Sequence, residues 1–244
     1  MRAGNVRRIF LERGYQTRPR LATIAEQAFA AGVDVVELDA QALFLRSRSD
    51  RHQGALAEAR PFRYSSLDDL LDHAGRQDAP PFLLVVDGVE DPHNLGAILR
   101  SADAAGVHGV VLPERRVAPV TPVVARASAG AVDHVRLAQV GNLSHALEIL
   151  KERGVWVYGL EMDGEQEFDS PDYRGPVALV VGAEGRGLGR LVREHCDVVV
   201  RIPLVGHVES LNVSVATSLA LFAVRRGRDR APLSASLSGT AVLP

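Results

Sequence analysis

The sequence has little of what several classes of protein require. Among its 244 residues there is one cysteine, Cys196, so an intramolecular disulfide is impossible and a cysteine-based metal site is disfavoured. The longest apolar runs, such as residues 82–86, are far shorter than the roughly 20 residues of a membrane-spanning helix. No hydrophobic stretch follows the arginine-containing N-terminus, so no secretory signal is visible. We therefore expect a cytoplasmic protein with no membrane partner and no metal.

Acidic and basic residues nearly balance over the whole chain, but they are unevenly distributed. The formal net charge is −2. Residues 1–63 contain eleven arginines and seven acidic residues, a net charge of +4 that leaves −6 on the remainder. A basic segment joined to a mildly acidic body is a plausible footprint for RNA binding, although short basic runs are also common on solvated faces.

The first quarter of the chain predicts a small α/β domain, residues 1–63. We expect helices at 20–31 and 40–46, and strands at 33–38 and 54–60. A linker is predicted at 64–81, with a short helix at 66–73. It ends at the paired prolines 80 and 81, which stop regular structure and mark a domain boundary.

Beyond residue 81, strand-like and helix-like segments alternate. We expect strands at 82–86, 108–112, 135–138, 155–160, 177–181 and 198–202, and helices at 95–105, from 121, at 142–153, 188–195 and 212–225. This alternation favours an α/β fold, a mostly parallel sheet with helices on both faces, over residues 82–226. Residues 227–244 lose the periodicity and predict a disordered tail.

Three loops that follow predicted strands, at 87–94, 182–189 and 204–212, have unusual compositions. Ligands of open parallel sheets bind at the carboxyl ends of the strands. The loop 182–189, GAEGRGLG, is rich in glycine. It fails the dinucleotide fingerprint because Val192 stands where a third glycine is needed, and the chain has no P-loop lysine motif. An ordinary nicotinamide or nucleotide site is disfavoured, which leaves a nicotinamide oxidoreductase as a remote alternative.

The polar residues of these loops also have simple structural interpretations. Asn94 is a possible helix N-cap, and Arg100 can form a surface ion pair with Asp103, three residues further along the helix. Glu184 can pair with an arginine, and both Ser210 and Asn212 resemble caps for the last helix. Taken one segment at a time, these alternatives stay open.

Together, the three segments resemble the three motifs of the SpoU branch of the SPOUT RNA methyltransferases. The matching stretches are NLGAILRSADAAG at 94–106, LVVGAEGRGL at 179–188, and IPL at 202–204 followed by SLNVSVAT at 210–217. Order, spacing and residue identity agree in all three. The stretch DGVEDPHNLGA at 87–97 is similar to the bacterial 23S ribosomal RNA guanosine 2′-O-methyltransferases. HQG at 52–54 resembles the end of that group's N-terminal substrate-binding domain, whose first helix is not evident, so we expect a domain truncated at its start.

The resemblance implies a C-terminal deep trefoil knot and transfer of the methyl group of S-adenosyl-L-methionine to a ribose 2′-hydroxyl of RNA. It implies a homodimer in which each site is completed at the subunit interface. The cofactor's adenine is expected against main-chain groups of Gly182, Ile202 and Leu211. No metal is implied.

The family's motif residues fall here on Asn94, Arg100, Glu184, Ser210 and Asn212. Arg100 matches the residue often described as the base, but a guanidinium with a pKa above ~12 is hard to deprotonate. We expect Arg100 to bind the adjacent phosphate and polarise the hydroxyl, with Glu184 orienting it. Asn94, Ser210 and Asn212 would position the ribose and the cofactor.

Two alternatives share the scaffold. The first is a 2′-O-methyltransferase that acts on transfer RNA, or on a ribosomal RNA site that confers antibiotic resistance. The second is a non-catalytic RNA-binding protein. The presence of Arg100, Glu184, Ser210 and Asn212 argues against this second alternative, since binding alone needs none of that set.

Overall fold

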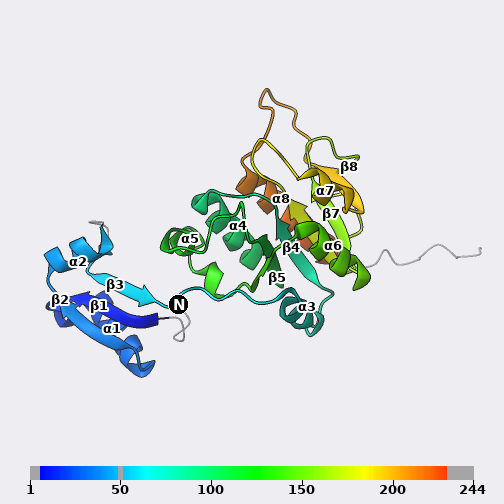
Figure 1. The fold of residues 1–244 in the computed structure, drawn as a ribbon. Coiled ribbons are helices and arrows are strands. Elements are labelled where there is room, and N and C mark those ends of the chain that lie inside the picture. Colours follow the sequence, from blue (N-terminus) through cyan, green and yellow to red (C-terminus); the bar gives the residue numbers. More distant parts are fainter. Residues whose placement is uncertain (1–5, 49–51, 230–244) are drawn as a thin grey trace, which may run out of the picture. The chain divides into compact units, whose positions relative to one another are not determined.

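The computed structural model describes residues 6–48 and 52–229 (Figure 1). The chain divides into two compact units, Met1–Arg63 and Tyr64–Pro244. In the part of the chain that is described, no helix is both long and apolar enough to cross a membrane. No group of three or more His, Cys, Asp or Glu side chains in that part could hold a metal ion.

The first unit is built on a three-stranded sheet of order β2-β1-β3. The central strand pairs in parallel with one neighbour and antiparallel with the other. The elements are β1 (Val6–Glu12), a 3₁₀ turn (Tyr15–Thr17), α1 (Pro19–Ala30), β2 (Asp34–Leu38), α2 (Ala40–Ser47) and β3 (Ala55–Ala59). Strand β1 is missing from the sequence prediction. Its residues show no clean alternation because the adjacent Phe10 and Leu11 are both buried in the middle of the sheet.

The second unit contains a seven-stranded sheet of order β6-β5-β4-β9-β7-β10-β8, and all its strand pairs are parallel. This confirms the predicted α/β architecture. The strands are β4 (Phe82–Val86), β5 (Gly109–Pro113), β6 (Leu137–Val140), β7 (Trp156–Leu160), β8 (Gln166–Glu167), β9 (Val177–Val181) and β10 (Val198–Arg201). The helices are α3 (Leu67–Gly75), α4 (Pro92–Ala104), α5 (Pro122–Ala127), α6 (Leu143–Glu152), α7 (Arg190–Glu194) and α8 (Val213–Asp229), with a 3₁₀ turn at Ala131–Asp133.

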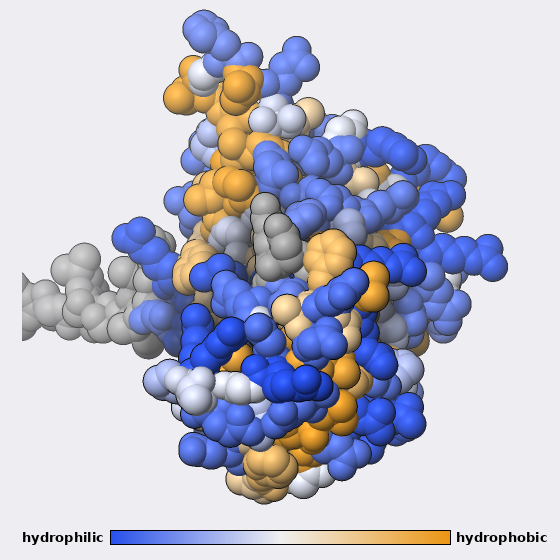
Figure 2. All heavy atoms as spheres, turned by 90° about the vertical axis from the view of Figure 1, so that its left-hand side faces the viewer, coloured by the Kyte–Doolittle hydropathy of each residue, from blue (hydrophilic) through white to orange (hydrophobic). Residues whose placement is uncertain are grey.

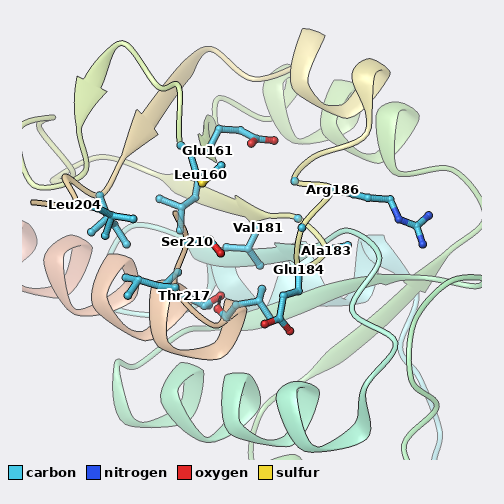
Figure 3. A pocket seen from close by; sticks show the side chains of 17 residues that line it. Leu160, Glu161, Val181, Ala183, Glu184, Arg186, Leu204, Ser210 and Thr217 are labelled. Atoms are coloured by element: carbon cyan, nitrogen blue, oxygen red, sulfur yellow. Dashed lines mark hydrogen bonds between the residues drawn. The ribbon is translucent and has the colours of Figure 1, made fainter. Parts of the chain in front are cut away.

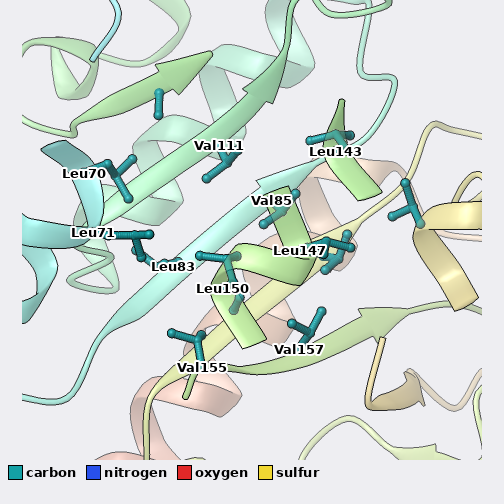
Figure 4. Close-up of a cluster of buried hydrophobic side chains, with 14 of the residues drawn as sticks. Leu70, Leu71, Leu83, Val85, Val111, Leu143, Leu147, Leu150, Val155 and Val157 are labelled. Atoms are coloured by element: carbon teal, nitrogen blue, oxygen red, sulfur yellow. The ribbon is translucent and has the colours of Figure 1, made fainter. Parts of the chain in front are cut away.

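Apolar layers cover both faces of this sheet, which is why β4 and β9 are buried along their whole length. On one face, Leu83 and Val85 of β4 pack with leucines of α3 and α6 (Figure 4). Because side chains alternate along a strand, Leu84 and Val86 point to the opposite face. There α4 contacts α8, and α8 contacts β9.

Two predicted boundaries differ from the structure. The segment 64–81, predicted as a linker, contributes α3 to the core of the second unit, where Leu70 and Leu71 are buried. The tail predicted from 227 begins too early, because α8 continues to Asp229. Residues 230–244 lie outside the described part of the chain. The trefoil knot stays a prediction.

A half-buried cation joins the end of α8 to the start of the sheet. The Arg228 guanidinium donates hydrogen bonds to the carbonyls of Pro80 (2.7 Å), Pro81 (2.7 Å) and Gly175 (2.8 Å), and lies 5.0 Å from the Phe82 ring centroid. Burial, with a smaller contribution from Arg225, lowers the pKa of Arg228 to about 10. These bonds hold the segments that lead into β4 and β9, the two central strands.

We predict that Arg228→Met lowers the free energy of unfolding by about 2 kcal/mol or more, because three carbonyls lose a charged donor. Urea denaturation measures this change. The matched control is Arg226→Met, an exposed arginine on the same helix, which should stay within about 0.5 kcal/mol of the unmodified protein. Equal stability of the two variants would contradict the structural role of Arg228.

Candidate functional site

The candidate site lies at the carboxyl ends of four neighbouring strands, β4, β9, β7 and β10. The residues that directly follow these strands are Asp87, Gly182, Glu161 and Ile202. Parallel pairing places these four positions at the same edge of the sheet, where open α/β sheets bind ligands. The three loops singled out in the sequence, 87–94, 182–189 and 204–212, all begin at this edge.

A cavity of about 220 Å³ opens among these loops (Figure 3). Apolar side chains form much of its wall, and the glycine-rich loop 182–187 forms another part. The lining residues are Leu160, Glu161, Met162, Val181, Gly182, Ala183, Glu184, Gly185, Arg186, Gly187, Ile202, Leu204, Ser210, Leu211, Val213, Ala216 and Thr217. We call this space the first cavity.

The loop after β9 folds back tightly on itself. Ala183 and Gly187 exchange two backbone hydrogen bonds, of 3.1 and 2.9 Å. A Cβ atom at position 182 would collide with the backbone of Gly187, so only glycine fits there. Gly187 itself has φ +64°, and a side chain at that position would collide with the Glu161 carboxylate. Gly182 therefore lets the two ends of the loop approach each other closely, and Gly187 leaves room for the Glu161 carboxylate.

Two carboxylates hold the far end of this loop. Glu161 accepts a hydrogen bond from the backbone N–H of Leu188, and Asp87 accepts one from Gly189 (2.8 Å). Neither residue is among the predicted site residues. Each is nevertheless the first residue after a predicted strand, a position that indicates a ligand-binding edge of the sheet. Their partners, however, are backbone groups that only the folded chain reveals.

A chain of side-chain hydrogen bonds crosses the site from loop to helix. The Asn94 amide donates to Glu184 Oε2 (3.4 Å), and the Asn212 amide donates to Asn94 Oδ1 (3.0 Å). Asn212 Oδ1 accepts from the backbone N–H of Ser214 (2.9 Å) and so caps α8. Segments about ninety residues or more apart in the sequence thereby meet at one point.

These contacts decide between the structural alternatives left open by the sequence. Asp91, whose carboxylate accepts from the backbone of His93, caps α4, so the interpretation of Asn94 as the cap is wrong. Glu184 contacts Asn94 and forms no ion pair with an arginine of the described chain. The expectation of a cap at Asn212 is confirmed.

The structure brings most of the predicted site residues together. Glu184, Ser210, Gly182, Ile202 and Leu211 all line the first cavity. Asn94 and Asn212 lie beside it through their hydrogen bonds.

Arg100 is placed apart from the other predicted residues. It is exposed on α4 and lines neither this cavity nor the neighbouring one. The ion pair considered for it does not form with any residue that the structure describes.

A second cavity, of about 490 Å³, adjoins the first. Ala183, Glu184, Arg186, Gly187 and Val213 line both, so the glycine-rich loop acts as a shared wall. The rest of the lining comes from Asp87, Gly88, Val89, Glu90, Asp91, Asn94, Arg116, Leu188 and Gly189. Glu184, which lines both cavities, and its hydrogen-bond partner Asn94 lie where the two cavities adjoin.

Comparisons with known proteins agree with this arrangement. The model of the SpoU rRNA Methylase family matches residues 81–222. A 23S rRNA (guanosine-2′-O-)-methyltransferase RlmB from Ralstonia nicotianae is 45% identical over 94% of this chain and 91% of that protein. One of the same name from Xanthomonas campestris pv. campestris is 47% identical over 93% and 90%. The crystal structure of an AdoMet-bound rRNA methyltransferase from Sinorhizobium meliloti matches with a TM-score of 0.77 at 29% identity, over 91% of this chain and 80% of that one.

We predict that Gly182→Ala destabilises the protein by at least about 1–3 kcal/mol, because the added methyl group collides with rigid backbone. Urea denaturation gives the change in unfolding free energy. Gly75→Ala is the matched control, since a Cβ there meets no atom within 4 Å. If Gly182→Ala were as stable as that control, the close approach of the loop would be wrong.

Proposed function

This chain belongs to the SpoU rRNA methylase family, and from that premise we propose that it methylates the ribose 2′-hydroxyl of a guanosine in 23S ribosomal RNA, with S-adenosyl-L-methionine as the methyl donor. The observation that carries this proposal is the clustering of the family's motif positions around one cavity. The two relatives described above, whose alignments cover more than nine tenths of this chain, bear the name of that activity.

The first cavity fits S-adenosylmethionine. Its apolar wall, with Val181, Ile202 and Leu211, suits an adenine ring, and Gly182 lets the main chain approach closely. A glycine-rich loop that matches no phosphate-binding template agrees with a cofactor that has no phosphate. We infer that main-chain groups of Gly182, Ile202 and Leu211 hold the adenine. The bound cofactor supplies an electrophilic methyl group on a sulfonium.

The chain's own residues then position the acceptor and polarise its hydroxyl. Glu184 and Asn94 lie at the junction of the two cavities, where a ribose 2′-oxygen can face the methyl group. Asn212 fixes the Asn94 amide, and Ser210 presents a hydroxyl on the cofactor side. Arg100, as a permanent cation, binds the phosphate beside the target ribose and polarises the hydroxyl.

A homodimer completes the site in this proposal. Because Arg100 lies outside both cavities of its own chain, we infer that it serves a site formed with another copy. Helix α8 carries an exposed apolar stripe of Val215, Leu219 and Phe222, which are 48%, 44% and 49% exposed. This spacing lies on one helical face and suits packing against a second subunit.

The proposal assigns the RNA contact outside the active site to the basic first unit. In the second unit, apolar side chains gather at a protruding tip, where Val205 and Val208 of the loop 203–210 are 102% and 64% exposed (Figures 1 and 2). Because the substrate is ribosomal RNA, we place the protein in the cytoplasm.

The direct test is incubation with radiolabelled S-adenosylmethionine and unmodified 23S ribosomal RNA or transfer RNA, followed by mapping of the modified ribose. We expect label at one guanosine of 23S ribosomal RNA. Label in transfer RNA alone would move the activity to the alternative substrate. Binding of the cofactor without label on either RNA would favour the non-catalytic alternative.

Arg100→Ala should lower methyl transfer by about 100-fold or more, the typical cost of removing one donor that stabilises developing charge. Cofactor affinity, measured by calorimetry, should not change, because Arg100 does not line the first cavity. Arg126→Ala, at another exposed arginine of the same unit, is the control. Full transfer by Arg100→Ala would refute the role of Arg100.

A further inference from the structure

The second cavity has no assigned ligand, yet its position restricts what it can hold. It shares a wall that contains Glu184 and Gly187 with the first cavity, which we assign to the cofactor. Methyl transfer requires the acceptor oxygen in contact with the methyl group, so the target nucleotide must lie in space that adjoins the cofactor. The second cavity is such a space, and its volume of about 490 Å³ falls in the range of small-ligand pockets.

Arg116, one of the two arginines that line this cavity, has an unusual backbone conformation. Arg116, in the loop after β5, has φ 61°, a left-handed conformation that is costly for a residue with a side chain. The loop is anchored here, since the backbone N–H of Ala118 donates to the carbonyl of Val89 (2.9 Å) in the opposite wall. The neighbouring Arg115 does not line the cavity. Strained residues of this kind concentrate at functional sites.

The charges around Arg116 leave its guanidinium available for a ligand. Two carboxylates of the lining are engaged with backbone groups, Asp87 with Gly189 and Asp91 with His93. Neither these nor Glu90 forms an ion pair with Arg116, and no other residue in the described ranges does so. An exposed, unpaired guanidinium offers a planar fork of donors that matches a phosphate group.

We propose that the second cavity seats the target nucleotide of the RNA and that Arg116 binds one of the two phosphates that flank this nucleotide, the other being the phosphate assigned to Arg100. This inference rests on the proposed function. Arg116 is a positioning residue, because it holds the substrate's backbone and leaves the reacting atoms to Glu184, Asn94 and Arg100. Of the two arginines that line the second cavity, Arg186 also lines the first cavity, so Arg116 is the one whose loss separates RNA binding from cofactor binding.

The test is Arg116→Gly, compared with Arg115→Gly, in methyl transfer to 23S ribosomal RNA. Glycine adopts the left-handed conformation without strain, so the fold should be retained. For Arg116→Gly we expect KM for RNA to rise about tenfold or more with a smaller change in kcat. The slope of log affinity for RNA against log salt should fall by about one, as for the loss of one phosphate contact. Cofactor affinity should be unchanged, and Arg115→Gly should match the unmodified protein.

Three results would overturn the inference while the unmodified protein is active. These are an unchanged KM and salt slope in Arg116→Gly, equal effects in Arg115→Gly, and a loss of cofactor affinity. Arg116→Lys keeps the positive charge but loses the planar set of guanidinium donors. Compared with Arg116→Gly, it should have the salt slope of the unmodified protein but only part of its affinity for RNA. Failure of the proposed function looks different, because then the unmodified protein itself transfers no methyl group to any RNA.

Discussion

The close approach of Gly182 to the backbone of Gly187 is the constraint on which the site depends. It folds the loop after β9 into a thin wall, with one cavity on each side. A bulkier residue at 182 would push the two strands of the loop apart and merge or close these spaces. Main-chain groups of this loop therefore border the first cavity, and Glu184 lines both cavities. Glu161 and Asp87 fix its far end.

The parallel sheet makes this wall possible. Four neighbouring strands end at one edge. Of the residues that directly follow them, Gly182 belongs to the loop, Asp87 and Glu161 anchor it, and Ile202 lines the first cavity. The half-buried cation Arg228 ties the last helix to the segments entering β4 and β9. Helix α8, which Asn212 caps, is thus connected at its other end to the strands that directly precede Asp87 and Gly182. Binding and chemistry therefore depend on a rigid frame, in which polar groups are placed by main-chain contacts.

The differences between prediction and structure have physical causes. Strand β1 lacks alternation because it is a central strand in which adjacent apolar residues are buried. The segment 64–81 resembles a linker in composition, although Leu70 is buried in the hydrophobic cluster on one face of the large sheet. Asn94 looked like a helix cap, since a cap and a partner in a long-range hydrogen bond need the same residue type. Arg100 belongs to the motif by sequence but lies outside both cavities, because a motif records residue types and spacing and not which side chains line a cavity.

The sequence alone determined the α/β alternation, the strands that end at the site, and the family with its motif residues. Hydrophobic periodicity and motif spacing are local properties of the chain, so they can be read without a fold. Tertiary structure decided which of those residues meet: the Glu184–Asn94–Asn212 contacts, the anchoring by Glu161 and Asp87, and the separation of two cavities by one loop. These features arise between segments far apart in sequence, and only the packing of the sheet and helices sets their distances.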